Sequence, residues 1–168
     1  MFYNCWSLKS LDFLDRLDTS GVTNMNGVFR ACTLLKEIDI STWDMSNVTV
    51  SNSLFNSCTN MERVVYPDSM TRVGQSQFNY CLSLLSVRIP PNVTSIAPYA
   101  FEYTQNLILF DFRDLLQVPV LENANAFTNN TNPNKKIVVP DSLYEQWKSA
   151  NNWNALSQFI VSASDYSD

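Results

Sequence analysis

The chain has 168 residues, with 16 acidic and 11 basic side chains, a net charge of −5 and 45% apolar residues, which suits one compact domain. It has no histidine and only three glycines, which excludes His-based catalytic triads, His-ligated zinc and a glycine-rich phosphate loop. The negative balance without a basic run argues against a nucleic acid or an anionic membrane as partner. No apolar run approaches the ~18 residues of a bilayer span, and the first residues lack signal-peptide features, so we expect any export signal to lie outside this sequence.

The phenylalanines and cysteines reveal an internal repeat. Each cysteine lies three residues after a phenylalanine, and apolar residues follow six, nine and eleven positions after the same phenylalanine. The intervals between these phenylalanines, 23 to 27 residues, are typical of a solenoid. The units begin at Phe2, Phe29, Phe55, Phe78 and Phe101, with a degenerate unit at Phe127, and the cysteines are Cys5, Cys32, Cys58 and Cys81.

Each unit is expected to contain one turn and one strand. The spacing from phenylalanine through cysteine to the next apolar residue predicts a tight helical turn that points these side chains into the core. The residues nine and eleven positions after phenylalanine alternate with variable ones, as in Ser86-Val87-Arg88-Ile89, which indicates a short strand with one buried face. Neither element can bury its apolar side alone, so the units must stack.

The second halves of the units are of two kinds. Residues 18–25 and 44–49 are rich in Asp, Ser and Asn and predict turns. The next two units are shorter, and Pro67 and Pro90 should stop their strands because proline cannot donate to a ladder. In the fifth unit Thr104 replaces the cysteine. In the degenerate unit Asn130 and Pro133 replace the cysteine and leucine, and the strand Ile137-Val138-Val139 comes one residue late.

The C-terminal residues predict a cap. Pro140 should close the last strand, and Ser142 with Glu145 forms a candidate capping box for a helix whose apolar stripe is Leu143, Trp147 and Ala150. A second short helix is expected from Trp153, with Leu156, Phe159 and Ile160 inside. We therefore divide the chain into a repeat array (1–134), a terminal strand and helical cap (135–161) and a disordered tail (162–168). At the other end Phe2 is already a core position, so we expect upstream repeats or a neighbouring domain to cover it.

The units at 29–40 and 78–90, with their F-x-x-C-x-x-L pattern, resemble the leucine-rich repeats of the BspA-like surface-protein family. The polar half-units 18–25 and 44–49 are similar to the Asp-Thr-Ser-x-Val-Thr-x-Met repeats of bacterial surface lipoproteins of that broad class, and 139–148 resembles the family's terminal cap. The resemblance implies repeats that serve adhesion and binding, with no catalytic residues. The predicted fold is an α/β, right-handed leucine-rich-repeat solenoid with a parallel sheet on one face and a small C-terminal helical cap.

Several residue patterns admit a second interpretation. The cysteines are interpreted as a buried ladder of free thiols, with a metal site or disulfides as the alternative. Asp12, Asp39 and Asp111 share one repeat position and suggest calcium or acid/base chemistry, but a solvated strand face explains them as well, and no calcium-loop motif is present. The Asn-x-Thr sequons are interpreted as turns; they begin at Asn47, Asn92 and Asn129.

Aromatic residues are a further candidate for ligand contact. They could stack on sugars or on a protein partner, although partly covered aromatic side chains are normal on the flank of a solenoid. The residues in question are Trp6, Trp43, Tyr3, Tyr80 and Tyr103.

The strand alternation also predicts a binding face. Residues eight and ten positions after phenylalanine should point outward and form two parallel rows about 20 Å long, because neighbouring strands lie ~4.8 Å apart. The rows are Ser10, Glu37, Arg63, Ser86 and Leu109, and Asp12, Asp39, Val65, Arg88 and Asp111. Their charge changes sign from an acidic first end to a basic middle, so a charged partner should dock in one orientation and bind less tightly in salt.

The leading functional prediction is therefore a non-enzymatic, extracellular or cell-surface recognition module that binds a protein or a glycan, without a cofactor or bound metal, as part of a longer polypeptide. Two alternatives stay open at this stage. The array could be a passive spacer, or the non-catalytic targeting domain of a larger surface enzyme.

Overall fold

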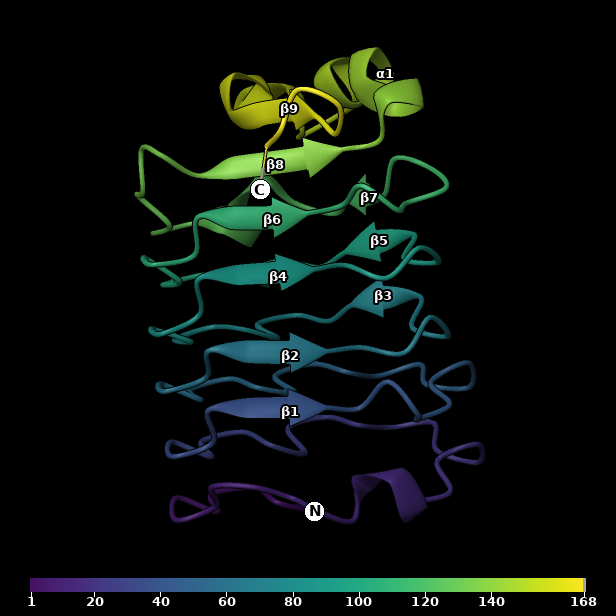
Figure 1. Cartoon of the computed structure of the whole chain (residues 1–168), viewed down its shortest axis with the longest axis vertical. Helices are drawn as coiled ribbons and strands as arrows, with labels where there is room; N and C mark the ends of the chain where they lie inside the picture. The colour runs from purple at the N-terminus through teal and green to yellow at the C-terminus, as the bar shows by residue number, and fades with distance from the viewer. Residues whose placement is uncertain (168) are drawn as a thin grey trace.

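The computed structural model describes residues 1–167 and shows six coils of chain stacked along one axis (Figure 1). Coils 1 to 6 begin at Phe2, Phe29, Phe55, Phe78, Phe101 and Phe127. The N-terminus lies at one end of the stack, and helix α1 (Tyr144–Ser149) lies at the other. No helix within residues 1–167 is long and apolar enough to cross a bilayer.

In coils 2 to 6, one strand per coil lines a common side of the stack, the strand face. The strands are β1 (Glu37–Asp39), β2 (Arg63–Val65), β4 (Ser86–Arg88), β6 (Leu109–Asp111) and β8 (Lys136–Val139), and β9 (Ile160–Ser162) follows at the C-terminal end. They form two parallel sheets, β1-β2 and β4-β6-β8-β9. The predicted positions are confirmed for coils 2 to 5, and β8 is one residue late, since Lys136 pairs with Leu109.

A second row of strands was not expected. Strands β3 (Arg72–Val73), β5 (Ser95–Ile96) and β7 (Val120–Leu121) form a parallel sheet in the order β3-β5-β7. For the half-units with β3 and β5 the sequence predicted only that Pro67 and Pro90 end the preceding strands. Two-residue strands are too short to give an alternation of apolar and polar residues, so the sequence pattern did not predict them. In coils 1 and 2 a single bridge between Asn24 and Val50 takes their place.

The segment from phenylalanine to cysteine is a β-turn rather than the expected helical turn. In coil 1, for example, the Cys5 N–H donates to the Phe2 carbonyl at 3.1 Å. The third residue of each turn has φ between 55° and 62°, the left-handed region, which costs a non-glycine residue about 1 kcal/mol. These six residues are Asn4, Ala31, Ser57, Tyr80, Tyr103 and Asn129.

The left-handed turn lets two N–H groups per coil face the next coil. The N–H groups of the phenylalanine and of the left-handed residue each donate to a carbonyl of the following coil, at 2.7 to 3.3 Å. Phe2 N–H bonds Val28 O and Asn4 N–H bonds Arg30 O, and the same pair recurs at every step up to coil 6. We call this series the turn ladder. It joins all six coils without a break.

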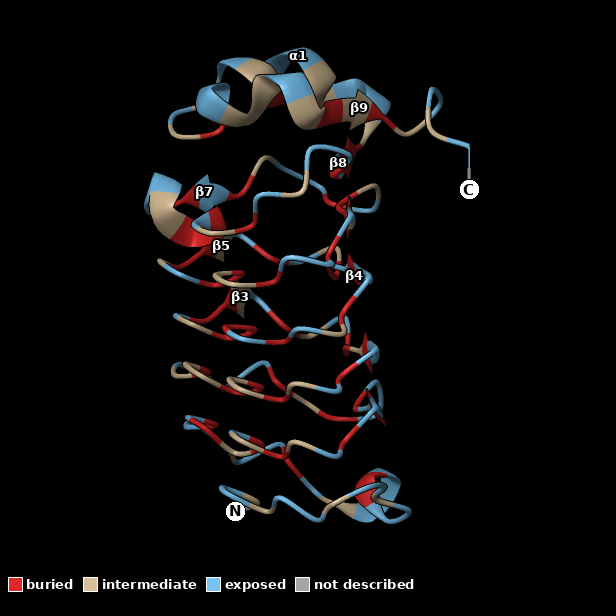
Figure 2. Cartoon of the chain, turned by 90° about the vertical axis from the view of Figure 1, so that its left-hand side faces the viewer, coloured by how far each residue is buried: buried red, intermediate tan, exposed pale blue. Residues whose placement is uncertain are grey.

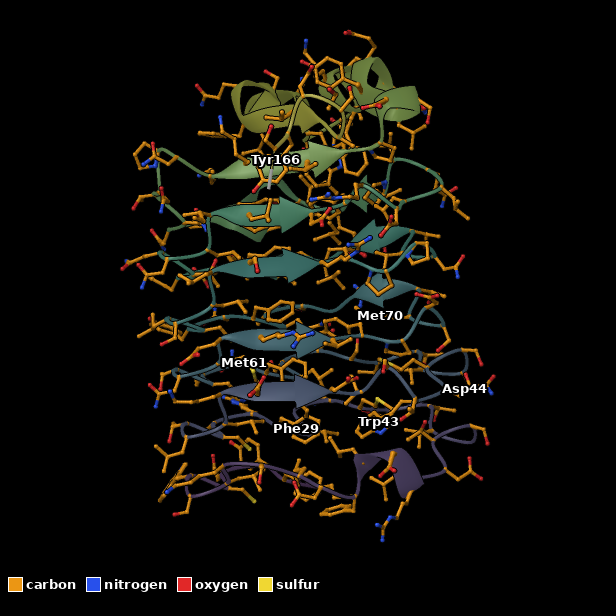
Figure 3. The ribbon with its side chains drawn as sticks, viewed as in Figure 1. Phe29, Trp43, Asp44, Met61, Met70 and Tyr166 are labelled. Carbon is orange, nitrogen blue, oxygen red and sulfur yellow. The ribbon has the colours of Figure 1, made fainter. Side chains whose placement is uncertain are left out.

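The phenylalanine rings inside the turn ladder stack along the axis of the solenoid. Successive ring centroids lie 5.3 to 6.0 Å apart, with interplanar angles of 5° to 22°. Phe29 lies within the stack in Figure 3, and Figure 2 shows buried residues along the inner side of every coil. Trp43 is also a core residue, stacked on Phe29 at 6.0 Å, so it offers no surface for a ligand.

The cysteines form the expected ladder of free thiols. All four are unbridged, and Cys32, Cys58 and Cys81 are buried. Each of these three thiols donates to the phenylalanine carbonyl of the preceding coil at 3.0 to 3.2 Å. In coil 6 the amide of Asn130 also joins its coil to the preceding one, but through another acceptor, since Nδ2 donates to Thr104 O at 2.8 Å. The stack therefore continues through the degenerate unit.

The C-terminal segment packs on the last coil through two tryptophans. Trp147 of α1 and Trp153 are both fully buried, and their rings lie 5.4 and 5.7 Å from that of Phe112. The predicted capping box is absent: residues Asp141–Leu143 form a 3-10 turn (η3), and the N-cap of α1 is Leu143, without a side-chain bond. Ser142 therefore lies inside a turn instead of at the cap.

The remaining short helices are 3-10 turns. They are η1 (Leu14–Arg16), η2 (Ala124–Phe127) and η4 (Asn154–Phe159). Segment η4 replaces the predicted second helix, and Ile160, expected on its inner side, begins strand β9.

The residues after 161 differ from the expected disordered tail. Ser162 ends β9, and the Ala163 N–H donates to Val139 O at 2.9 Å. The Ser164 N–H donates to Asp141 Oδ1 at 2.9 Å, and the ring of Tyr166 lies 5.7 Å from the guanidinium of Arg113. Figure 3 shows Tyr166 in front of the upper strands. Backbone bonds to β8 thus hold this segment against the strand face; Asp168 lies outside the described residues.

Removing the buried ring of Trp147 should destabilise the protein. We expect Trp147→Ala to lower the free energy of unfolding by about 3 to 5 kcal/mol, because the substitution leaves a large cavity beside Phe112. Thermal or urea denaturation measures the change, and Gln146→Ala, at an exposed site of the same helix, serves as the control. A melting temperature within a degree or two of wild type would show that α1 contributes little to the stability of the core.

The thiol ladder predicts a graded reactivity. Burial raises the pKa of Cys32 to about 11 and that of Cys58 to about 12, so both stay protonated and unreactive at pH 8. Cys5 is only partly buried and should react first with iodoacetamide in the native protein. Mass spectrometry after labelling in denaturant without reductant should show four modified thiols. A product with two or none would contradict the free ladder.

Candidate functional site

The strand face carries most of the predicted binding rows. Glu37 pairs in register with Arg63, and Asp39 with Val65; likewise Ser86 pairs with Leu109. The exposed members are Ser10, Asp12, Glu37, Asp39, Arg63, Ser86 and Arg88, whereas Val65 and Leu109 are half-buried and Asp111 is buried. The structure thus brings together the members from coils 2 to 5, but it does so in two separate blocks.

The first coil departs from the predicted rows. Ser10 and Asp12 lie outside any strand, and Phe13, expected to point inward, is 41% exposed. Leu14 at the start of η1 is buried in its place. The rows of paired strands therefore begin at Glu37, and Asp12 lies beside them on a turn.

At the C-terminal end of the rows, the carboxylate of Asp111 is engaged in ion pairs. Asp111, expected to point outward, has a side chain only 8% exposed. Arg113 Nε donates to its Oδ1 at 2.9 Å, and Arg88 lies 3.9 Å from its Oδ2. Because Tyr166 covers Arg113 in turn, Asp111 is not available to a ligand, and the prediction for this residue was wrong.

The central feature of the strand face is a break between β2 and β4. Ile40 and Ile89, both eleven residues after phenylalanine, donate to the next coil at 2.9 and 2.8 Å. Tyr66 occupies the same place in coil 3, yet no backbone hydrogen bond within residues 1–167 joins β2 to β4. Figure 1 shows the wider spacing of these two strands. Backbone N–H and C=O groups along both edges are thus left for water or a ligand.

A cleft of about 450 Å³ lies over this break. Its lining includes residues from both edges and from the loop beyond β6, among them Arg63, Val65, Tyr66, Ser86, Arg88 and Asp114. Four of these six belong to the predicted rows, namely Arg63, Val65, Ser86 and Arg88. The cleft itself was not predicted.

The ring of Tyr66 lies in the core beside the break between β2 and β4. It is buried and meets the rings of Phe55 and Phe78 edge-on, each at 6.1 Å, and these two phenylalanines are 6.0 Å apart instead of 5.3 to 5.4 Å. The Gln77 amide donates to the Tyr66 hydroxyl at 2.7 Å. Tyr66 stands where coils 2 and 4 have isoleucine and coil 5 has Phe112, whose N–H still donates to Val138 O at 2.8 Å, so the size of this side chain did not mark the break.

Gln77 is itself fixed by a backbone contact. Its Oε1 accepts the Gly74 N–H at 2.7 Å. A Cβ on Gly74 would lie 2.5 Å from Ser51 O, so only glycine fits at this approach of coils 2 and 3. Two hydrogen bonds thus link the Tyr66 hydroxyl through the Gln77 amide to the backbone of Gly74.

The charges around the cleft are less basic than the sequence indicated. Arg88 forms ion pairs with Asp114 and Asp111, which neutralise it. Arg63 enters no ion pair among those found in residues 1–167 and remains a cation on the rim. Hydrogen bonds from Ser41, with Arg63 as a weaker cause, hold the pKa of Asp39 below its usual value, so it is charged at neutral pH.

The groups around the cleft are charged side chains and backbone hydrogen-bonding groups. In the part of the chain that the structure describes, no three His, Cys, Asp or Glu side chains come close enough to hold a metal ion. The site offers unpaired backbone groups, one unpaired guanidinium and a rim of carboxylates. Such an arrangement suits a ligand that brings both hydrogen-bond donors and acceptors.

Comparisons with known proteins agree with this architecture. The family model for the BspA type leucine-rich repeat region matches residues 1–134 in six copies. A search of curated proteins found no significant match.

Among solved structures, a leucine-rich cell surface protein from Faecalibacterium prausnitzii has a TM-score of 0.57 and 24% identity, covering 82% of this chain and 33% of its own. The leucine-rich repeat protein of T. pallidum has a TM-score of 0.51 and 19% identity, covering 68% of this chain and 49% of its own. The chain thus spans a third to a half of these proteins, and the likeness concerns the fold.

Amide hydrogen exchange should reveal the break. We expect the Tyr66 amide to exchange far faster than those of Ile40 and Ile89, because it alone of the three has no acceptor in the next coil. Exchange followed by NMR compares three amides at one repeat position, so their coils serve as internal controls. Equal protection of all three would mean that β2 and β4 pair in solution and that the cleft is closed.

Proposed function

Because the chain belongs to the BspA type leucine-rich repeat family, we propose that it is a non-enzymatic recognition module of a bacterial cell-surface protein, and that its ligand is an extended protein segment bound at the cleft between β2 and β4. The similar protein of F. prausnitzii is described as a cell surface protein, which supports this setting. The observation that carries the proposal is the sheet break with its unpaired backbone groups.

A polypeptide is the ligand that best suits these groups. Its backbone alternates N–H donors and C=O acceptors, the same set that the facing edges of β2 and β4 leave unpaired. The rim adds selectivity: Arg63 favours an acidic side chain, whereas Glu37 and Asp39 in the neighbouring strand favour a basic one. A segment with separated charges would therefore bind in one direction.

The architecture supports a rigid presentation of this site. We also propose that the coils wind in a right-handed sense, as parallel crossover connections do in nearly all sheets, and that α1 with Trp147 and Trp153 caps the C-terminal end of the array. The burial of both tryptophans against Phe112 supports the cap.

A cleft-blocking variant tests the proposal. Peptides selected from a yeast-displayed random library on the wild-type protein should bind Ser86→Trp at least tenfold more weakly, because the indole fills the cleft at an exposed edge position. Gln117→Trp, which adds the same ring at an exposed site away from the cleft lining, should bind like wild type. Circular dichroism checks that both variants fold.

Two further results bear on the same proposal. Arg63→Ser should weaken acidic peptides more than basic ones, and the affinity should fall as salt is raised. Selected peptides that bind Ser86→Trp and wild type equally would show that the cleft is not the site and would favour a spacer role for the array.

A further inference from the structure

Two tyrosines form a stacked pair on the outside of the turn ladder. Tyr80 of coil 4 and Tyr103 of coil 5 have ring centroids 4.5 Å apart and planes inclined by 17°. Both occupy the left-handed position of their turns, with φ of 60° and 55°. Neither belongs to the buried core, and Tyr80 is 43% exposed. None of the residues that line the cleft belongs to this pair.

The backbone conformation at the left-handed position of the turn does not require tyrosine. The other four coils place Asn4, Ala31, Ser57 and Asn129 there with the same backbone conformation. Any non-glycine residue bears the same backbone strain, and the rings of the pair bury no core surface. The aromatic side chains therefore need an explanation outside the stability of the stack.

One face of the pair is open. Tyr80 uses one ring face against Tyr103, and its other face points along the axis toward coil 3. The equivalent residues of coils 3 and 2 are Ser57 and Ala31, whose side chains are too short to cover it. The face of the Tyr80 ring that is turned away from Tyr103 thus lies beside the turn ladder without a second ring stacked on it.

Polar groups border this surface at the neighbouring repeat position. Asn56 accepts from the Ser57 hydroxyl at 2.8 Å through its Oδ1, which leaves its amide N–H groups as donors. Asn79 donates to Glu102 Oε2 at 2.6 Å but is itself buried, at 7% exposed. The row next to the ring therefore offers the amide N–H groups of the half-buried Asn56 as donors.

We propose that the outer face of Tyr80, with the amide donors of Asn56, is a binding subsite for a β-linked hexopyranose of a glycan. The axial C–H groups of such a sugar present a flat apolar face to the aromatic ring, and its equatorial hydroxyls both donate and accept hydrogen bonds at the edge. A cation would also favour the ring face, but Glu102, the carboxylate beside the pair, already accepts from Asn79. This subsite is separate from the cleft and goes beyond the proposed function.

Saturation-transfer NMR with cellotetraose and chitotetraose tests the subsite directly. We expect transfer from the Tyr80 ring to the sugar C–H protons, and binding at least tenfold weaker in Tyr80→Ser. That variant should fold normally, because Ser57 holds the same conformation in coil 3. Tyr80→Phe keeps the ring and should keep most of the affinity.

The chain offers a matched control. Tyr99 is also an exposed tyrosine in the left-handed region (φ 58°), and Ser53 and Ser76 occupy its place in the preceding coils. Tyr99→Ser should therefore bind both tetrasaccharides like wild type. Ser86→Trp, which blocks the cleft, should do so too, so failure at one site is distinguishable from failure at the other.

Three results would overturn the subsite. The first is the absence of binding of both tetrasaccharides at about 10 mM, the weak end of the range for a single sugar contact. The second is equal affinity of Tyr80→Ser and wild type. The third is displacement of the sugar by tetra-arginine at lower concentration than by free cellotetraose, which would assign the ring face to a cationic partner.

Discussion

The turn ladder is the interaction on which the rest of the structure depends. Two backbone hydrogen bonds join each coil to the next at the phenylalanine turn, and this series continues through all six coils. The two donors are the phenylalanine and the left-handed residue two positions later, and both N–H groups face the same neighbouring coil. The phenylalanine stack and the thiol ladder lie directly inside it, so backbone and core register are set at the same place.

The strand pairing on the two sides of the stack, by contrast, is interrupted at different levels. On the strand face the break falls between coils 3 and 4, beside the buried ring of Tyr66. On the opposite side the sheet β3-β5-β7 starts only at coil 3, and coil 2 is joined to coil 1 by one bridge. Coil 3 thus pairs with coil 2 on one side and with coil 4 on the other. The cleft is a product of this offset, since the turn ladder keeps the coils in line while the strands separate.

The sequence was sufficient for the features that depend on local period. The Phe–Cys spacing located the first four coils and the phenylalanine interval the other two, and the alternation around Ile38, Val64, Val87 and Phe110 located the strands. A three-residue spacing fits a helical turn and a β-turn equally, and the left-handed position holds asparagine, alanine, serine or tyrosine, so no glycine marked it. The helical turn was therefore the wrong choice between two conformations of the same spacing.

The candidate site depends on non-local contacts, which a period cannot show. The cleft lies where β2 and β4 do not pair, and the residue type at that repeat position does not indicate it, because Phe112 in coil 5 is also aromatic and its strand still pairs with coil 6. Asp111 has the same repeat position as Asp39, yet Arg88, Arg113 and the C-terminal residues bury it. The tyrosine pair was visible as two aromatic residues at one repeat position, but its strained backbone and open face required the structure.

The offset of the two sheet breaks has a mechanical consequence. A load applied along the axis of the array is carried at coils 3 and 4 by the turn ladder and by the β3–β5 pairing, both of which lie away from the strand face. The strand face has no ladder bonds there to resist extension, so we expect the array to yield first by widening the gap between β2 and β4. Tension along the molecule would then change the width of the cleft in which we propose that a segment binds.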